Sequence, residues 1–225
     1  MSLIVSNSQY NLLIAADKIY YSQWAITFLK TLHYHVPWLS LHCHLVNSKD
    51  VEKLPYVNYT HEEIQFSNDD QKLGYLQAVR FLAVANKFTN NESVVVLDCD
   101  CLCVKPFTQD QFSKLFDQQF VLQYNKKDRR WMAGFVTFKD NEFRQAYAAE
   151  LLKKPVEDWP IGWDQEVMKQ ISEKYKFVEL SDDWMSLMKY NGKSYFFTGK
   201  GGKKFKQSFL ERYNFFVNRD LKGKN

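Results

Sequence analysis

Glycine and proline are scarce in this sequence, with eight and five among 225 residues. That scarcity excludes collagen-like and low-complexity chains, and 45% hydrophobic residues with 16% aromatics exclude an intrinsically disordered one. No apolar run approaches the roughly 18 to 20 residues needed to cross a bilayer. The first residues also lack a basic segment followed by a cleavable apolar stretch. The composition therefore predicts a globular chain without a transmembrane segment, located in the cytoplasm.

Cysteine is also scarce, and its four copies give no disulfide framework. Cys99, Cys101 and Cys103 alternate within five residues, which leaves Cys43 as the one distant partner. This spacing favours reduced thiols and a reducing compartment.

Charge of one sign is not in large excess, but its distribution is uneven. The formal net charge is +4, and residues 200–225 hold eight basic and two acidic residues, so residues 1–199 carry a net charge of −2. A nucleic-acid-binding protein usually spreads basic residues over one face or helix, so no nucleic-acid partner is expected. A basic tail after an acidic body suits a phosphate ligand or an anionic surface.

Strand and helix patterns alternate along the chain. Strands are expected at residues 12–16, 41–46, 94–97, 120–124, 134–138 and 177–180, and helices at residues 25–32, 70–88, 143–151 and 164–175. The unbroken apolar run Val94–Leu97 is typical of a strand covered on both faces of a parallel sheet. The pattern predicts a single α/β domain over residues 1–225, with a mostly parallel central sheet flanked by helices. Residues 181–225 would form a basic, aromatic C-terminal extension or lid.

Two aspartates, Asp98 and Asp100, directly follow that apolar strand. In an extended backbone their side chains point the same way, at the strand end where open α/β sheets bind ligands. A Mn²⁺ or Mg²⁺ ion would relieve their repulsion and leave positions for diphosphate oxygens. The pair therefore predicts a metal-diphosphate site, and the alternative is a solvated strand end with two surface acids. The alternating cysteines 99, 101 and 103 would then lie opposite the aspartates, packed against a helix.

The segments around this pair resemble the GT-A glycosyltransferases, which have a Rossmann-like fold, and in particular the glycogenin and lipopolysaccharide galactosyltransferase family (glycosyltransferase family 8). The N-terminal LIAADKIYY resembles that family's A-x-D-x-x-Y pattern, which implies that Ala15, Asp17 and Tyr20 hold the nucleotide base. The helix with Arg80 resembles the one whose arginine approaches the donor diphosphate. The resemblance also implies a nucleotide-sugar contact for Cys99, between the two aspartates.

Two later segments extend the resemblance. WMAGFVTF is similar to a strand usually written N-A-G, with Met132 where asparagine is usual and with matching Ala133 and Gly134. WDQEVM is similar to the family's D-Q motif, which implies that Asp164 and Gln165 lie beside the transferred sugar.

The family's last motif, H-x-x-G-x-x-K, is matched only in part by FFTGKGGKKF. Gly199 aligns with the motif's glycine, but Phe196 stands where the metal-binding histidine is expected, and Lys203 comes one residue late. The third metal ligand therefore has no assignment. Lys200, Lys203, Lys204 and Lys206 could still close over a diphosphate and offset its charge, with Gly199 and Lys203 as the expected nucleotide-sugar contacts. The alternative is a flexible, solvated tail.

Three of these residues also have purely structural interpretations. Asp17 could simply end a strand, the Arg80 side chain could extend from its helix to solvent, and Asp164 could be the N-cap of the helix that follows it.

These patterns together predict a metal-dependent glycosyltransferase, a hexosyltransferase in which Asp164, Gln165 and Arg80 act in catalysis. It would transfer a sugar from a nucleotide-diphosphate sugar, expected to be a UDP-sugar, to a saccharide or lipid-linked saccharide. Two alternatives remain open. One is a haloacid-dehalogenase-type phosphohydrolase, with Asp182 and Asp183 as magnesium ligands. The other is a non-catalytic nucleotide-sugar or carbohydrate-binding module.

Overall fold

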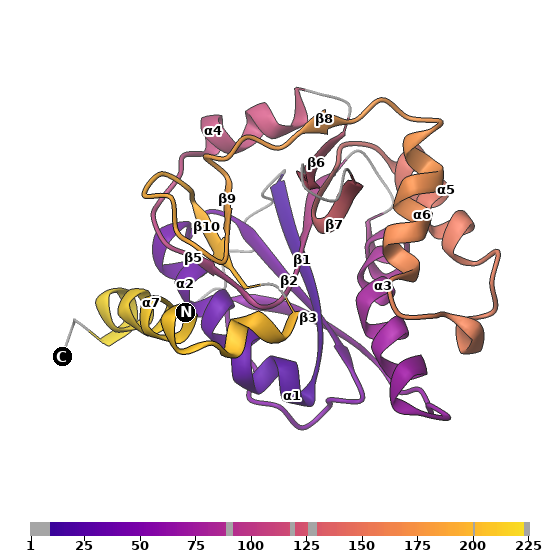
Figure 1. Ribbon diagram of the computed structural model, residues 1–225, viewed down its shortest axis with the longest axis horizontal. Coiled ribbons are helices and arrows are strands. Elements are labelled where there is room, and N and C mark those ends of the chain that lie inside the picture. Colours follow the sequence, from indigo (N-terminus) through magenta and orange to yellow (C-terminus); the bar gives the residue numbers. More distant parts are fainter. Residues whose placement is uncertain (1–9, 89–91, 118–119, 126–129, 200, 223–225) are drawn as a thin grey trace.

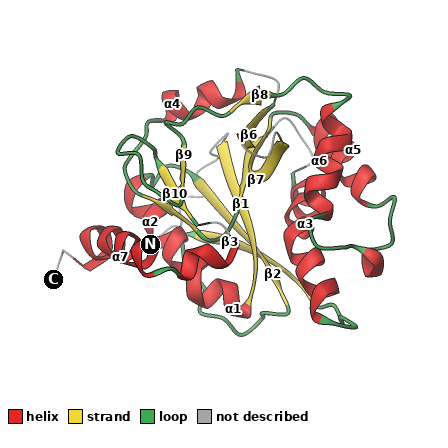
Figure 2. Cartoon of the chain, viewed as in Figure 1, coloured by secondary structure: helices red, strands yellow, loops and turns green. Residues whose placement is uncertain are grey.

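A computed structural model of the chain describes residues 10–88, 92–117, 120–125, 130–199 and 201–222. These residues form a seven-stranded central sheet and a separate three-stranded sheet, with helices around both (Figures 1 and 2). The central sheet has the spatial order β3-β2-β1-β4-β7-β6-β8. Its strands are β1 (Tyr10–Asp17), β2 (Ser40–Val46), β3 (Val57–Glu62), β4 (Ser93–Leu97), β6 (Val121–Asn125), β7 (Arg130–Phe138) and β8 (Val178–Glu179).

The small sheet has the order β5-β10-β9, from β5 (Cys101–Cys103), β9 (Met185–Leu187) and β10 (Phe196–Thr198). The α-helices are α1 (Lys18–Tyr20), α2 (Ile26–His35), α3 (Asp69–Lys87), α4 (Gln109–Ser113), α5 (Asn141–Leu151), α6 (Trp163–Ser172) and α7 (Gln207–Val217). Short 3-10 or π turns are η1 (Tyr21–Ala25), η2 (Lys114–Phe116), η3 (Val156–Asp158), η4 (Gly201–Phe205) and η5 (Asn218–Lys222). Within the described ranges, no helix has the length and apolar character to span a bilayer.

Most strands of the central sheet are parallel to their neighbours. β1 pairs in parallel with β2 and β4, β2 with β3, and β6 with β8, whereas β7 is antiparallel to β4 and β6. The mostly parallel α/β sheet flanked by helices is therefore confirmed.

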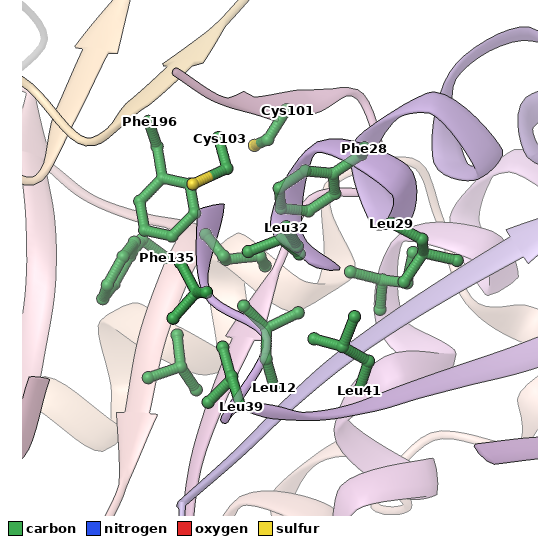
Figure 3. Packing of buried hydrophobic residues seen from close by; sticks show 14 of the residues in the cluster. Leu12, Phe28, Leu29, Leu32, Leu39, Leu41, Cys101, Cys103, Phe135 and Phe196 are labelled. Atoms are coloured by element: carbon green, nitrogen blue, oxygen red, sulfur yellow. The ribbon is translucent and has the colours of Figure 1, made fainter. Parts of the chain in front are cut away.

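Each face of the central sheet packs against its own hydrophobic cluster. Alternate residues of β1 point to opposite faces, so Leu12 packs with Phe28 and Leu32 of α2, and Leu13 packs with Val84 of α3. Figure 3 shows the first of these clusters, in which side chains from the central sheet, α2 and the small sheet meet. Figure 1 shows α3, α5 and α6 together on one side of the sheet and α2 on the other. Double-sided burial is the physical reason for the unbroken apolar runs in β1 and β4.

Two parts of the fold differ from the sequence expectation. β3 was not expected, because it lies at the sheet edge and its mainly polar residues are half-buried or exposed. The extension after residue 181 has more regular structure than its sequence indicates, with β9, β10 and α7. Strands of three residues, such as β9 and β10, are too short to show the alternation of apolar and polar residues that identifies a strand in a sequence.

The strand order determines where a ligand site can form. The chain leaves β1 for β2 on one side, whereas β4 pairs with β1 on its other side. Such a reversal of strand order leaves a crevice outside the carboxyl ends of the two strands. Asp17 ends β1 and Asp98 follows β4, so both carboxylates lie at this crevice.

The hydroxyl group of Thr31 joins α2 to β5, the strand that begins directly after Asp100. Thr31 is fully buried, donates to the Phe28 carbonyl at 2.9 Å and accepts from the Cys103 N–H at 3.2 Å. This bond helps hold β5, the strand that follows Asp98 and Asp100, in place against α2.

Thr31→Val should lower the free energy of unfolding by about 1–3 kcal/mol, because the buried Cys103 N–H loses an acceptor while the side-chain shape is kept. The matched control is Ser22→Ala, which removes an exposed hydroxyl that donates to the Lys18 carbonyl and should change stability by no more than about 0.5 kcal/mol. Urea denaturation measures both. Equal losses would contradict a special role for the buried hydroxyl.

Candidate active site

A cavity of about 220 Å³ lies at the carboxyl ends of β1 and β4, between α3 and the C-terminal extension. Eight of the residues expected from the sequence line it, namely Ala15, Asp17, Tyr20, Arg80, Asp98, Cys99, Asp100 and Gly199. The structure therefore brings residues from four distant segments to one cavity.

Asp17 marks one end of this cavity and has two partners. Its Oδ1 accepts from the Tyr20 N–H at 2.9 Å and so caps the short helix α1, while its Oδ2 lies 2.8 Å from Lys72 Nζ. The side chain is 8% exposed. Asp17 thus ends its strand, as the structural interpretation holds, and still presents a carboxylate at the cavity wall.

Arg80 is the most highly connected cation of the site. Its Nη1 lies 2.6 Å from Asp98 Oδ1, and its Nη2 donates to Asp164 Oδ2 at 3.2 Å and to the Ala133 carbonyl at 3.0 Å. Burial lowers the pKa of Arg80, but the two aspartates raise it to a net value above normal, so the guanidinium stays charged. The side chain is 9% exposed, so it does not reach into bulk solvent.

Asp164 lies behind Arg80 and does not line the cavity. Burial and, to a smaller extent, the nearby Asp98 raise the pKa of its carboxyl group against the pull of Arg80, to a net value of about 6. The N-cap of α6 is Gly162, with φ of 81°, and not Asp164, which is the second residue of the helix. The N-cap interpretation of Asp164 was therefore wrong, because Gly162 adopts the left-handed conformation that begins the helix two residues earlier.

Gln165 on α6 and Gly134 on β7 support the site without lining the cavity. The Gln165 amide is oriented to donate to the Trp131 carbonyl at 3.1 Å and to accept from the Ala133 N–H at 2.8 Å. A Cβ atom on Gly134 would lie 2.8 Å from Asp98 Oδ2, so glycine is required for the carboxylate to lie against the strand.

Asp100 pairs with a lysine from the extension. Its Oδ2 accepts from Lys204 Nζ at 2.7 Å, and its Oδ1 lies 3.3 Å from the Thr198 hydroxyl. Burial raises the pKa of Asp100, as does Asp98, and Lys204 opposes both. Lys204 lines the cavity, whereas the expected Lys203 is exposed and does not.

The segment between the aspartates is a turn and not a continued strand. Cys99 consequently lines the cavity together with both aspartates, although it also packs against the edge of the core in which Cys101 and Cys103 are fully buried. The expectation that all three cysteines lie opposite the aspartates was wrong for Cys99, because the extended alternation stops at Leu97 and resumes at Cys101.

One group of cavity residues was missed although the sequence held a signal for it. Leu73, Leu76 and Gln77 line the cavity beside Arg80, at the i, i+3, i+4 and i+7 spacing of one helical face. Placing Arg80 on a helix was therefore enough to identify its neighbours.

A second group gave no usable signal. Gln123 comes from β6, and Met185 and Leu187 come from β9. All three line the cavity, as does Met132, the cross-strand partner of Gln123, which the sequence had placed at the asparagine position of the N-A-G strand. Their positions depend on strand register and on a three-residue strand, neither of which can be determined from local sequence pattern.

The expected divalent cation can be tested against these side chains. Asp98 and Asp100 each have a cationic partner within 2.7 Å, and the described residues contain no group of three His, Cys, Asp or Glu side chains able to hold a metal. Phe196, at the place of the expected histidine, is fully buried in the core. The donor set does not fit a divalent cation while Arg80 and Lys204 hold these positions.

Comparison with solved structures shows which proteins share this fold. The galactosyltransferase LgtC, in a complex with donor and acceptor sugar analogs, superposes with a TM-score of 0.65 at 11% identity, over 94% of this chain and 96% of that one. The glycosyltransferase GlyE of Streptococcus pneumoniae, in its apo form, superposes with a TM-score of 0.61 at 13% identity, over 95% of this chain and 63% of that one. The chain therefore has the GT-A fold and resembles LgtC. Neither the family models nor the curated proteins gave a match to the sequence.

The raised pKa of Asp164 makes a prediction for stability against pH. A carboxyl group whose pKa is higher in the folded than in the unfolded chain stabilises the fold at low pH, and this contribution disappears as pH rises through the folded value of about 6. Asp164→Asn removes the titration. Its free energy of unfolding relative to wild type should therefore rise by about 3 kcal/mol between about pH 4 and pH 8.

Urea denaturation of both proteins across this range measures the change. Asp182→Asn is the control, because Asp182 is exposed and its difference from wild type should stay constant. A constant difference for Asp164→Asn as well would show that the buried carboxyl group does not titrate in this window.

Proposed function

We propose that this chain is a glycosyltransferase that moves a hexose from a nucleotide-diphosphate sugar, a UDP-sugar, to a hydroxyl group of a saccharide or lipid-linked saccharide. The GT-A fold supports this proposal, and so does the likeness to LgtC, whose structure holds donor and acceptor sugar analogs. The cytoplasmic location stays a prediction from the sequence. The Mn²⁺ or Mg²⁺ cofactor expected from the sequence is not part of this proposal, because Asp98 and Asp100 are each paired with a cationic side chain.

The single observation that carries the proposal is the set of charges that line one cavity. A carboxylate, Asp17 at the end of β1, lines it together with two cations held by carboxylates, Arg80 and Lys204. A uridine diphosphate offers complementary groups, because its uracil has an N–H donor and its diphosphate is anionic. Arg80 and Lys204 are thus suited to the diphosphate, and Asp17 to the base.

The transfer breaks the bond between the anomeric carbon and the diphosphate oxygen, and the electron pair goes to the diphosphate. A bond forms between the acceptor oxygen and the anomeric carbon, and the acceptor hydroxyl group releases its proton. The products are the glycosylated acceptor, UDP and a proton. Negative charge grows on the departing diphosphate, and Arg80 and Lys204 are fixed in place to stabilise it.

In this scheme Asp164 and Gln165 act as positioning residues. Asp164 holds the guanidinium of Arg80, and Gln165 ties α6 to the backbone of β7 beside Gly134. Gln123 and Met132 line the same cavity and would contact the sugar.

The phosphohydrolase alternative is not favoured. Asp182 and Asp183 are exposed and do not line the cavity that contains Asp98, so they cannot serve as magnesium ligands beside it. The non-catalytic binding module differs from a transferase only in turnover, so an assay decides between the two.

The proposal is tested by calorimetry with UDP, ADP and GDP, followed by measurement of UDP release from a panel of UDP-hexoses with and without simple sugar acceptors. We expect UDP to bind best and at least one UDP-hexose to release UDP faster when an acceptor is present. Binding without turnover over the whole panel would favour the binding module. Phosphate release from p-nitrophenyl phosphate would instead support the phosphohydrolase.

Asp17→Asn should reduce the preference for UDP over CDP. A carboxylate accepts from the N–H of uracil and repels the unprotonated ring nitrogen of cytosine, whereas an amide can serve either base. We expect the ratio of the two dissociation constants to fall by about 10- to 100-fold, the value of one hydrogen bond to a charged group. Calorimetric titration of both nucleotides into both proteins measures it.

Asparagine also retains the cap on the Tyr20 N–H, so the variant should fold. Lys49→Gln serves as a control, because Lys49 is exposed and pairs with Glu63 away from the cavity. An unchanged UDP to CDP ratio in Asp17→Asn would place the base elsewhere.

A further inference from the structure

Lys204 is a buried lysine in a basic tail whose neighbours are exposed. It is 4% exposed, whereas Lys203 and Lys206 on either side of it in the sequence are exposed. Its Nζ donates to Asp100 Oδ2 at 2.7 Å and to the Tyr20 hydroxyl at 3.3 Å. The ammonium also lies 4.4 Å from the centroid of the Tyr20 ring and 5.5 Å from that of Trp24. This environment holds a positive charge in place by an ion pair, a hydrogen bond and two aromatic faces.

The backbone of η4 and Gly199 places the Lys204 side chain at Asp100. A Cβ atom on Gly199 would lie 2.3 Å from Lys204 Cβ and 3.0 Å from its Cα, so the turn η4 folds directly back onto Gly199. Phe209 of α7 lies on the same spot and is buried. Figure 1 shows this C-terminal segment in yellow beside α1, from which Tyr20 comes. The position of Lys204 is therefore part of the packed structure.

The ammonium stays charged in this place. Burial lowers the pKa of Lys204, but Asp100 and Tyr20 raise it, and the net pKa lies above its usual value. An ammonium has three N–H donors, and among the described residues the acceptors found for them are Asp100 and Tyr20. One donor is left for an anion in the cavity that Lys204 lines.

A divalent cation would have to displace this lysine. A Mg²⁺ ion can be held by one or two carboxylates together with substrate phosphates, so the lack of a third acidic ligand does not decide the question. The decisive feature is that Asp98 already pairs with Arg80 at 2.6 Å and Asp100 with Lys204 at 2.7 Å. The Thr198 hydroxyl, 3.3 Å from Asp100 Oδ1, is a weaker metal ligand than the imidazole of a histidine.

We propose that Lys204 is a built-in cation that takes the place of a divalent metal at Asp100, so that this chain binds a nucleoside diphosphate without a metal. This inference rests on the proposed function. Lys204 and Arg80 together supply the positive charge that the diphosphate needs, each fixed by its own aspartate. The two aspartates then serve to position cationic side chains.

The test is calorimetric titration of UDP into the full chain, once with EDTA and once with Mn²⁺. Free and bound Mn²⁺ are followed separately by electron paramagnetic resonance. Wild type should bind UDP in EDTA with an affinity that Mn²⁺ changes by less than about threefold, and it should leave the signal of free Mn²⁺ intact. Lys204→Met should lose at least about tenfold in UDP affinity in EDTA, since it removes a charge-assisted hydrogen bond. The vacated Asp100 carboxylate should then bind Mn²⁺ together with the UDP phosphates, which restores UDP binding.

Lys206→Met is the matched control, because it removes an exposed lysine of the same segment that does not line the cavity. It should behave as wild type. Lys204→Arg keeps the charge and should bind UDP in EDTA more tightly than Lys204→Met. The comparison of EDTA with Mn²⁺ on wild type requires no variant, so the test stands even if a variant fails to fold.

Each other result has a distinct meaning. If wild type binds UDP only in the presence of Mn²⁺, the proposal that Lys204 replaces the metal is wrong and the proposed function is unaffected. Undiminished UDP binding by Lys204→Met in EDTA would also contradict the role of Lys204. Absence of UDP binding under both conditions would refute the proposed function, and the inference would fall with it.

Discussion

The three-way contact of the Arg80 guanidinium is the interaction on which the rest of the site depends. A buried charge is tolerated only when it is paired with opposite charge. Arg80 is paired with Asp98 after β4 and with Asp164 on α6, and it also donates to the Ala133 carbonyl on β7, while its buried Nε has no acceptor among the described residues. The planar fork of arginine can reach all three at once, whereas a lysine could not. A single side chain of α3 therefore fixes three other elements around the cavity, and the cavity wall is set before any ligand arrives.

A second ion pair, between Asp100 and Lys204, holds the C-terminal extension against the rest of the fold. It joins the turn η4 to the residue just before β5 of the small sheet, and Trp24 packs beside it against Tyr213 of α7. The packing cluster there also contains Leu102 of β5 and Phe197 of β10. The extension is thus attached by apolar contacts and by buried polar pairs, of which Asp100 with Lys204 is one and His35 with Asp220 another. Loss of the pair with Lys204 would leave Asp100 buried without a cation, which is costly.

Much of the fold could be predicted from the sequence, because its long elements bury whole faces. The double-sided burial of β1 and β4 left unbroken apolar runs, and α2 carried Phe28, Leu29 and Leu32 at helical spacing. β3 lacked such a pattern because it is an edge strand, and β9 and β10 were too short to have one. The same limit applies to the candidate site. Residues at strand ends or on one face of α3 could be located from the sequence, whereas the positions of Gln123 and Met185 depend on pairing between distant strands.

The partial match of the last motif has a physical explanation in the structure. Alignment on Gly199 places Phe196 at the histidine position, yet Phe196 faces the core in register with Met185 and Cys103. The residues that meet Asp100 are Thr198 and Lys204, which are six positions apart, the same spacing as the histidine and lysine of H-x-x-G-x-x-K. In a strand, residues two positions apart point to the same face, so Thr198 shares the side-chain face of Phe196 in β10. In this register the spacing resembles that of the whole motif, with Gly201 at its glycine and a hydroxyl group where the motif has an imidazole. A hydroxyl group is a weaker metal ligand than an imidazole, while the lysine still reaches the carboxylate. Asp100 therefore favours the ammonium group of Lys204 over a metal ion.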